Sequence, residues 1–459
     1  MKFDIETDVL VIGAGGCGLA AAVAAHDAGA SVMVVEKLDR AGGNTALSTG
    51  SIPGAGTRYQ RERGIDDSPE RMIEDLVRTA GEHDVPAVTR VLAYESADLI
   101  DWLIERVGAR MRLIHEYRHI GHSVPRLHAP DSRRGADLFD DLLRAVEKRG
   151  VAVAVGNPVQ ALVTETTGAL IGAHIAGKGV SRYAVRARKI ILATNGFAGN
   201  REMVERYCPE IAGAEYFGAR GSEGEAVRWG AEVGAALGNM NAYQGYAAVA
   251  YPHGSLLSWT TVEKGGILVN ASGHRFGHED TGYSGYAREV LAQNAKVYAV
   301  FDERICAITR GEAEFLEQLA MGGFKIAADA RALAAQIGVD AQALEASIDT
   351  YGRAARAEQP DPFGRRDFGI APLAPPFYAC QVVPGLFHTQ GGLVIDAAAR
   401  VLRTDGSVVP NLFAGGGAAA GICGRAGAKG YASGAGLLTA VGLGRIAGRT
   451  AAAEVQSGG

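Results

Sequence analysis

The first 36 residues alternate apolar runs with glycines in an order that predicts two strands around one helix. Asp8–Ile12 is a short apolar run, GAGGCG follows at Gly13–Gly18, and an Ala-rich segment predicts a helix to Gly29. A second apolar run, Ser31–Val35, ends on Glu36. Glycines allow a tight turn, a helix N-terminus faces an anion, and a carboxylate suits a ribose hydroxyl, so the pattern predicts a dinucleotide site rather than a plain glycine turn.

Later segments add a second glycine turn and a series of strands. AGGNTALSTG at Ala41–Gly50 follows soon after Glu36, which favours FAD over NAD because such turns in large flavoproteins lie against the ribityl and isoalloxazine portions. Apolar runs bounded by turn residues predict strands at Val151–Val155, Gln160–Glu165, Leu170–Ala176 and Tyr183–Arg188. The apolar run in KIILATNG, Lys189–Gly196, predicts one more strand, which delivers Thr194, Asn195 and Gly196 to the nucleotide.

The whole pattern resembles the succinate dehydrogenase/fumarate reductase flavoprotein superfamily. The resemblance also rests on HTQGG at His388–Gly392, PNLFAGGG at Pro410–Gly417 and the closing segment that begins at Leu437. It implies an α/β fold: a Rossmann-type, glutathione reductase-like FAD-binding domain from residues 1–242 and 386–459, with an α+β cap inserted at residues 243–385. The substrate site would then lie between them.

The resemblance also implies a set of FAD contacts. The expected cofactor-binding residues are Gly13, Ala14, Gly15, Gly18, Glu36, Lys37, Gly42, Gly43, Asn44, Thr45, Gly50, Val159, Ala193, Thr194, Asn195, Gly196, Gly415, Gly416, Leu437 and Leu438. Two positions depart from the family pattern. Gly417 stands where many members carry an acid, so a ribityl contact is lost, and Asn44 stands where covalently flavinylated members carry His, so we expect non-covalent FAD.

Two tyrosines occupy positions where the fumarate-reducing branch carries arginines. Tyr283 follows the Arg275-Phe276 segment, and Tyr431 lies in RAGAKGYASGAG, residues 425–436. This pair resembles the 3-ketosteroid Δ1-dehydrogenase branch and its relatives that act on smaller cyclic ketones. There, the first tyrosine is the base, while the second, with the amide four residues on (Ala435), binds the carbonyl oxygen. Tyr117 is the candidate for a third tyrosine beside the base. The alternative is that both tyrosines only pack in a core.

The chemistry predicted from this pair is FAD-dependent α,β-dehydrogenation of a cyclic ketone. Tyrosine has an ordinary pKa of about 10, so it needs help to act as a base, and the developing enolate needs hydrogen-bond donors. His388 in HTQGG favours an anionic ketone such as a small oxo-cyclohexane carboxylate, although a 3-ketosteroid stays open. His388, Thr389 and Arg126 are the expected substrate contacts. Alternatively, His388 only orders its loop, or Arg425 is the carboxylate clamp.

Other functions remain as alternatives. A fumarate reductase-like reductase of an activated alkene would need an arginine acid where Tyr283 stands, and a flavin-binding sensor would show no turnover. The formal charge of −5 over 459 residues argues against nucleic-acid binding. The five cysteines lack metal or haem-attachment spacing, and Gly121 and Pro125 interrupt the histidine-rich stretch near residue 120, so we expect no metal and an external electron acceptor. No signal core or membrane span is evident, which predicts a cytoplasmic protein without an integral membrane segment.

Overall fold

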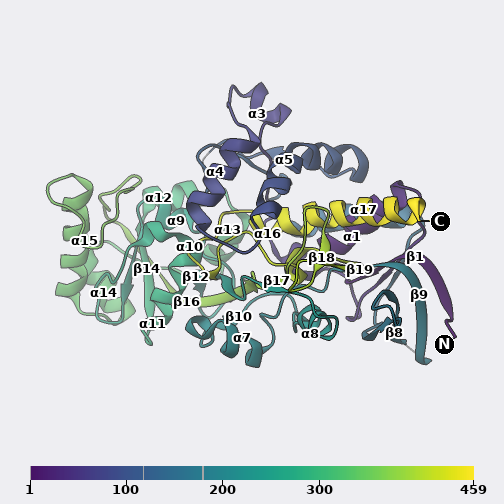
Figure 1. The fold of residues 1–459 in the computed structure, drawn as a ribbon. Helices are drawn as coiled ribbons and strands as arrows, with labels where there is room; N and C mark the ends of the chain where they lie inside the picture. Colours follow the sequence, from purple (N-terminus) through teal and green to yellow (C-terminus); the bar gives the residue numbers. More distant parts are fainter. Residues whose placement is uncertain (1, 117, 178–179, 459) are drawn as a thin grey trace. The chain divides into compact units, whose positions relative to one another are not determined.

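The computed structural model describes residues 2–116, 118–177 and 180–458 of the chain. The chain divides into two compact units. Unit 1 comprises Met1–Pro209, Gly218–Tyr243 and His388–Gly459, so it is built from both ends of the chain, and unit 2 comprises Glu210–Phe217 and Gln244–Phe387. Figure 1 follows the chain through both by colour.

An eight-stranded, mostly parallel sheet is the framework of unit 1. Its order is β18-β19-β9-β1-β2-β6, and β8 pairs with both β9 and β7. The strands are β1 (Ile5–Ile12), β2 (Val32–Val35), β6 (Ala152–Ala154), β7 (Val159–Thr164), β8 (Leu170–Gly177), β9 (Val180–Leu192), β18 (Arg400–Leu402) and β19 (Val408–Ala414). The neighbours β2, β1, β9 and β19 run parallel, as expected for a buried sheet with helical crossovers. The two strands predicted at 183–188 and 189–192 form the single strand β9.

Helix α1 (Gly16–Asp27) packs against the closing helix α17 (Leu443–Ser457) with their backbones in contact. A Cβ added at Gly444 would lie 2.2 Å from the carbonyl oxygen of Cys17, and one at Gly448 would lie 2.2 Å from that of Ala21. Small residues four positions apart on α17 therefore permit this approach. The C-terminal helix consequently holds the helix that follows the first glycine turn.

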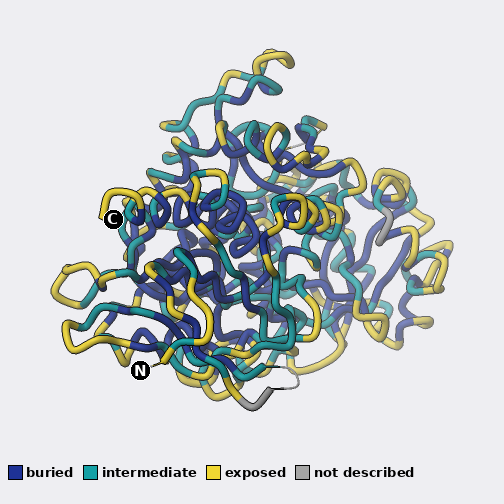
Figure 2. Tube along the Cα trace, turned by 90° about the vertical axis from the view of Figure 1, so that its right-hand side faces the viewer, coloured by how far each residue is buried: buried dark blue, intermediate teal, exposed yellow. Residues whose placement is uncertain are grey.

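The other elements of unit 1 lie outside the main sheet. β3 (Ile52–Pro53), β5 (Leu127–Ala129) and β4 (Arg112–Leu113) form a three-stranded sheet, and β11 (Leu237–Gly238) pairs with β17 (Gly392–Leu393). The helices are α2 (Gly43–Leu47), α3 (Arg58–Glu62), α4 (Pro69–Ala80), α5 (Pro86–Trp102), η1 (Leu103–Val107), α6 (Gly135–Lys148), α7 (Arg201–Tyr207), α8 (Glu225–Glu232), η4 (Gly416–Ala418), α16 (Ala435–Leu437) and η5 (Leu438–Gly442). Figure 2 shows buried segments in dark blue and exposed turns in yellow.

Unit 2 combines a sheet with short helices. In its sheet β13 (Ile267–Asn270), β14 (Val297–Asp302), β16 (Phe377–Thr389) and β12 (Asn241–Ala250) are neighbours in that order, and β10 (Glu215–Tyr216) and β15 (Lys325–Ala327) also pair with β16. The helices are α9 (Thr260–Glu263), η3 (Glu279–Thr281), α10 (Gly282–Gly285), α11 (Ala287–Ala292), α12 (Glu303–Thr309), α13 (Ala313–Ala320), α14 (Ala330–Ile337) and α15 (Ala341–Ala355). Phe301, Phe315 and Phe324 form an aromatic core beneath the sheet, with ring centroids 4.9–6.1 Å apart.

Among the described residues, no helix has both the length and the hydrophobicity of a transmembrane segment.

Candidate active site

The turn after β1 has the geometry of a phosphate-binding turn. Gly13 adopts φ +107°, and a Cβ there would lie 2.3 Å from the carbonyl oxygen of Ala193. A Cβ at Gly18 would lie 1.8 Å from the carbonyl oxygen of Gly13, so neither position accepts a side chain. At Gly15, the residue before α1, the nearest atom to an added Cβ is 3.9 Å away, and this N-cap residue makes no side-chain hydrogen bond to the helix. Open space at a helix N-terminus suits a pyrophosphate.

The acid at the end of β2 is held in place by main-chain amides. Glu36 accepts hydrogen bonds from the N–H groups of Ala14 and Leu38, each at 2.9 Å. A carboxylate has about four acceptor positions, so both oxygens keep capacity for ribose hydroxyls. Lys37 lies differently, because its ammonium pairs with Glu223 at 3.1 Å and with Glu225. Its side chain is thus engaged with carboxylates.

The second glycine turn lies directly beside the first. Gly42 forms a β-bridge with Gly15, and Gly43 adopts φ +64°. The hydroxyl of Thr45 accepts a hydrogen bond from the N–H of Gly16 at 3.2 Å. Asn44 accepts one from the N–H of Ala219 at 2.6 Å, so its side chain is tied to the main chain.

Two further predicted cofactor contacts are Gly50 and Val159. Gly50 adopts φ +69°, with Pro130 close to where its Cβ would be, and Val159 is the first residue of β7.

The segment after β9 leaves no room for a side chain at position 417. Asn195 has φ +65°, and its Oδ1 accepts a hydrogen bond from the N–H of Gly196 at 2.9 Å. A Cβ at Gly417 would lie 2.6 Å from that Oδ1 and 2.7 Å from the Gly196 nitrogen. The asparagine therefore fills the space that an acidic side chain at position 417 would enter. Ala193 joins this segment to β1 by donating its N–H to Ile12 at 2.8 Å.

The side-chain hydroxyl of Thr194, in this segment, is buried. Within the described part of the chain, Oγ1 of Thr194 has no hydrogen-bond partner. Buried hydroxyls are normally hydrogen-bonded, so an orphan beside the glycine turns indicates a place for a polar ligand. Together with the open helix N-terminus at Gly15 and the free acceptor positions of Glu36, it fits the phosphate and ribose groups of FAD.

The C-terminal glycines lie against the first helix. A Cβ at Gly415 would lie 2.8 Å from Sγ of Cys17, and the N–H of Gly415 donates to Leu192 at 3.1 Å. Gly416 adopts φ +58° at the start of a short 3-10 turn. Leu437 and Leu438 are buried, at the junction of α16 and the π-helical turn η5.

Tyr431 and His388 lie together in unit 1. Their ring centroids are 5.6 Å apart, with an angle of 68° between the ring planes. The Tyr431 hydroxyl oxygen and Nε2 of His388 are each 3.1 Å from the point where a Cβ of Gly436 would lie. Two polar atoms therefore converge above a residue that has no side chain. The N–H of Ala435, the other expected donor to the substrate, is engaged with the carbonyl of Ala432 at 3.2 Å.

The environment of His388 keeps its ring neutral. Burial lowers the pKa of His388 to about 4, while a hydrogen bond to the carbonyl of Thr389 opposes the shift. Nδ1 lies 3.2 Å from that carbonyl and 3.3 Å from Nε2 of Gln390. The hydroxyl of Thr389 accepts from the N–H of Phe197 at 3.1 Å, so it joins the end of β16 to the segment after β9.

Tyr283 lies in α10 of unit 2, in contact with aromatic rings that the sequence analysis missed. Its ring centroid is 5.1 Å from that of Tyr246, which is in turn 5.6 Å from that of Phe387. The Tyr246 hydroxyl donates to the carbonyl of Leu257 at 2.9 Å and accepts from the N–H of Trp259 at 3.2 Å. The ring of Tyr246 therefore packs against the ring of Tyr283. A lone tyrosine in a strand carries no sequence signal for this role.

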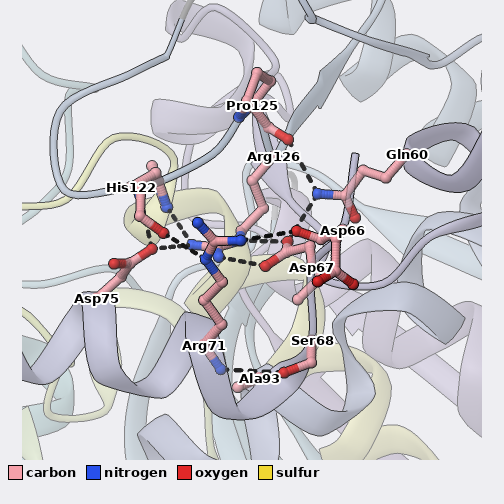
Figure 3. Close-up of polar contacts among 12 residues, drawn as sticks. Gln60, Asp66, Asp67, Ser68, Arg71, Asp75, Ala93, His122, Pro125 and Arg126 are labelled. Carbon is pink, nitrogen blue, oxygen red and sulfur yellow. Dashed lines mark hydrogen bonds and ion pairs between the residues drawn. The ribbon is translucent and has the colours of Figure 1, made fainter. Parts of the chain in front are cut away.

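Two other expected residues, Arg126 and Arg425, do not join these groups. Arg126 is fully buried and pairs with Asp67 at 2.6 Å and Asp75 at 2.9 Å, as Figure 3 shows, so its donors serve the protein interior. Arg425 is exposed and pairs with Asp84 at 2.8 Å. Tyr117 lies outside the described residues.

Comparison with known proteins agrees with this cofactor site. A family model described as an FAD binding domain matches residues 8–436. The chain belongs to this family, within the succinate dehydrogenase/fumarate reductase flavoprotein superfamily. It is therefore an FAD-dependent oxidoreductase with a mixed α/β fold.

Relatives of this FAD-binding family include enzymes of both branches. An NADH:fumarate oxidoreductase of Klebsiella pneumoniae is 32% identical over 91% of this chain, which spans only 45% of that protein's length. A 4-oxocyclohexanecarboxylate 2-dehydrogenase of Sinomonas cyclohexanicum is 29% identical over 97% of this chain and 93% of its own.

Similar solved structures also include a fumarate reductase and a ketosteroid dehydrogenase. A flavocytochrome c3 fumarate reductase in an open conformation matches with TM-score 0.82 and 28% identity, over 99% of this chain and 79% of that one. A 3-ketosteroid-Δ4-(5α)-dehydrogenase from Rhodococcus jostii RHA1, in complex with 4-androstene-3,17-dione, matches with TM-score 0.77 and 28% identity over 98% of both chains.

Proposed function

We propose that this flavoprotein catalyses the α,β-dehydrogenation of a cyclic ketone, either a small oxo-cyclohexane carboxylate or a 3-ketosteroid. The observation that carries the proposal is the presence of phenols, Tyr283 and Tyr431, at the positions where fumarate reductases have arginines. A guanidinium is always protonated and cannot accept a proton from carbon, whereas a phenolate can. The relatives named for 4-oxocyclohexanecarboxylate and 3-ketosteroid dehydrogenation support this direction of reaction.

In this proposal each residue has a separate task. Tyr283 takes the proton from the carbon next to the ketone, while the hydroxyl of Tyr431 donates a hydrogen bond to the enolate oxygen that develops. FAD, when bound, accepts the hydride from the neighbouring carbon, so the substrate gains a C=C bond. The amide of Ala435 would aid Tyr431, which requires that it exchange its bond to Ala432 for one to the substrate. Preformed donors aimed at such an oxygen are the largest contribution to this type of catalysis.

The surroundings of both tyrosines support a neutral carbonyl as the group recognised. The lowered pKa of His388, about 4, leaves it uncharged at neutral pH beside Tyr431. An uncharged imidazole suits a ketone better than it suits a dicarboxylate. Around Tyr283, the rings of Tyr246 and Phe387 supply apolar surface of the kind that packs against a carbocycle.

We assign the rest of the predicted site by the same reasoning. FAD would be held without a covalent bond, because Asn44 replaces the histidine that carries flavin in covalent members and is tied to Ala219.

The FAD-binding domain would comprise residues 1–242 and 386–459, and the cap would comprise residues 243–385. Electrons would leave to an external acceptor. Arg126 is omitted from the substrate contacts, since its donors are engaged by Asp67 and Asp75.

Anaerobic reduction of the bound flavin tests the proposal directly. The purified holoenzyme is mixed with 4-oxocyclohexanecarboxylate, with a saturated 3-ketosteroid and with succinate, and the loss of flavin absorbance is followed. We expect bleaching by at least one ketone and none by succinate. Absence of bleaching by every ketone, with flavin bound, would rule the proposal out.

A reductase of an activated alkene is the second candidate, since one branch of the relatives and neighbours carries that name. It predicts the opposite result. Chemically reduced enzyme would be reoxidised by fumarate, and succinate would give the reverse reaction. Tyr283 would then have to donate a proton rather than accept one.

A further inference from the structure

The loop that carries Tyr431 is in close contact with a segment more than 300 positions earlier in the chain. The N–H of Ser433 donates to the carbonyl of Ile120 at 3.0 Å, and Nε2 of His122 lies 2.8 Å from the carbonyl of Ser433. A Cβ at Gly121 would lie 2.5 Å from the Cβ of Ala432. The two segments therefore meet with no space for an added carbon.

His122 is held from behind by Arg126. The guanidinium donates to both oxygens of Asp67, through Nε at 2.8 Å and Nη2 at 2.6 Å. Its Nη1 serves two partners: Asp75 at 2.9 Å and Nδ1 of His122 at 3.1 Å. Figure 3 shows the guanidinium between the two carboxylates with the imidazole beside it. All of these side chains are buried, so the arrangement is fixed by well-formed, charge-assisted hydrogen bonds.

Arg126 decides which ring nitrogen of His122 carries the proton. A guanidinium can only donate, so Nδ1 of His122 must be the acceptor in their contact. The proton of the neutral ring then resides on Nε2, which donates to the carbonyl of Ser433. Protonation of Nδ1 would set two donors against each other. The tautomer is thus selected by Arg126, and the selected tautomer is the one that bonds to the Tyr431 loop.

We propose that His122 is a positioning residue for the Tyr431 hydroxyl, acting through the carbonyl of Ser433. Ser433 lies two residues after Tyr431 and two before Ala435, the two groups assigned to the ketone oxygen. The inference rests on that proposed function. A small displacement of such groups costs much in rate, because catalysis depends on preformed geometry.

Two amide substitutions separate the contacts of His122. In His122→Gln the side-chain nitrogen can occupy the place of Nε2, so the donor to Ser433 is kept and the acceptor for Arg126 is lost. In His122→Asn the shorter amide can accept from Arg126, but it does not reach Ser433. Both variants are neutral and polar, so each controls for the other.

Binding of 4-chlorophenol, a mimic of the enolate, gives a readout besides turnover. Its Kd is followed by the long-wavelength absorbance that phenolates give against oxidised flavin in the holoenzyme. We expect His122→Asn to weaken binding about tenfold and His122→Gln less than about threefold, as one hydrogen bond is worth. Equal loss in both variants, or a larger loss in His122→Gln, would overturn the inference.

The same two substitutions in a Tyr431→Phe background separate positioning from general loosening of the fold. If His122 acts through the Tyr431 hydroxyl, His122→Asn should change the Kd less than about twofold once that hydroxyl is gone. An undiminished tenfold effect would show that His122 does not act through the Tyr431 hydroxyl and would overturn the inference. Failure of the wild-type enzyme to bind the phenol or to be bleached by ketones would instead remove the proposed function itself.

Discussion

Arg126 in unit 1 and Arg275 in unit 2 are both buried arginines, and each pairs with two carboxylates. Arg126 pairs with Asp67 and Asp75, and Arg275 pairs with Glu279 at 2.7 Å and with an aspartate, Asp361, at 2.6 Å. Removing either arginine would leave one buried aspartate, Asp67 or Asp361, without its guanidinium partner, whereas Asp75 would keep Arg78 and Glu279 would keep Arg365. In composition the two networks are alike.

Their surroundings differ. The Arg275 guanidinium lies 4.8 Å from the ring centroid of Tyr351 and 5.3 Å from that of Phe363, so aromatic rings cover it. Its bond to Glu279 is local, four residues along the chain, just before the helix that carries Tyr283. Arg126 instead donates to His122, which reaches a distant loop. Arg126 thus reaches a distant loop through a neutral imidazole, whereas Arg275 pairs with its distant partner, Asp361, directly and is covered by aromatic rings.

The largest expected effect is on the rate of flavin reduction, and it distinguishes the role of Tyr283 from that of Tyr431. Tyr283→Phe should slow flavin reduction by a ketone roughly 10²–10⁴-fold, because the base is lost, while the Kd of 4-chlorophenol changes little. Tyr431→Phe should weaken phenol binding as well as slow the reaction. Stopped-flow absorbance and equilibrium titration measure the two quantities. A Tyr283→Phe enzyme within tenfold of the wild-type rate would show that another group is the base.

Removal of each guanidinium should have a smaller but still severe effect on stability. Arg126→Met and Arg275→Met each leave a buried aspartate, Asp67 or Asp361, without its guanidinium, at a cost of about 3–5 kcal/mol. Hydrogen exchange with mass spectrometry should place the loss in α4 and the Tyr431 loop for the first variant, and in the segment of η3 for the second. Loss of protection across unit 1 in the Arg275→Met variant would show that the two networks do not stabilise separate parts of the chain.

Acid should weaken unit 1 at a higher pH than unit 2. Burial lowers the pKa of His122 to about 4, aided by Arg126, so the unfolded chain takes up the proton first and stability falls as the pH drops from about 6.5 towards 4. The buried carboxyl of Asp361 behaves differently, because hydrogen bonds and the charge of Arg275 outweigh burial and lower its pKa. Its contribution is lost only below about pH 4.

The His122→Gln variant checks this difference. Between pH 7 and pH 5, its free energy of unfolding in urea should fall by about 2 kcal/mol less than that of the wild type. Identical pH slopes for the two proteins would contradict the assignment of acid sensitivity to His122.

The smallest effect concerns two glycines with the same φ of +84°, Gly121 and Gly108. An added Cβ at Gly108 meets no atom within 4 Å, whereas one at Gly121 meets Ala432. Gly108→Ala should therefore cost about 1 kcal/mol, from backbone strain alone, and Gly121→Ala should cost more and weaken phenol binding. Thermal unfolding measures the first quantity. Equal costs would mean that the Tyr431 loop yields easily to the segment of His122.

The sequence was sufficient for the nucleotide end of the fold because its signals are local. Strand, glycine turn, helix and acid follow one another within residues 8–36, and the structure has β1, α1 and β2 there. The family was also recognisable from short motifs near the C-terminus. Hydrophobic periodicity and turn residues carry this kind of information.

The Arg126 network could not be predicted, because its partners are remote in the chain. Asp67 is 59 positions from Arg126 and Asp75 is 51, so no spacing rule connects them. The sequence alone therefore predicts that Arg126 is a substrate contact. Tyr246 was missed for a related reason, since its approach to Tyr283 depends on how a strand and a helix pack. The roles of Tyr283 and Tyr431 remain predictions.

The asparagine at position 195 makes the loss of an acid at position 417 difficult to reverse. Any side chain there would collide with the backbone nitrogen of Gly196 as well as with the amide of Asn195, whose other end is fixed to Ser222 at 2.8 Å. Trimming Asn195 alone would therefore not readmit a carboxylate. Only a coordinated rebuilding of both loops could, so this protein would have to bind the ribityl chain by other means.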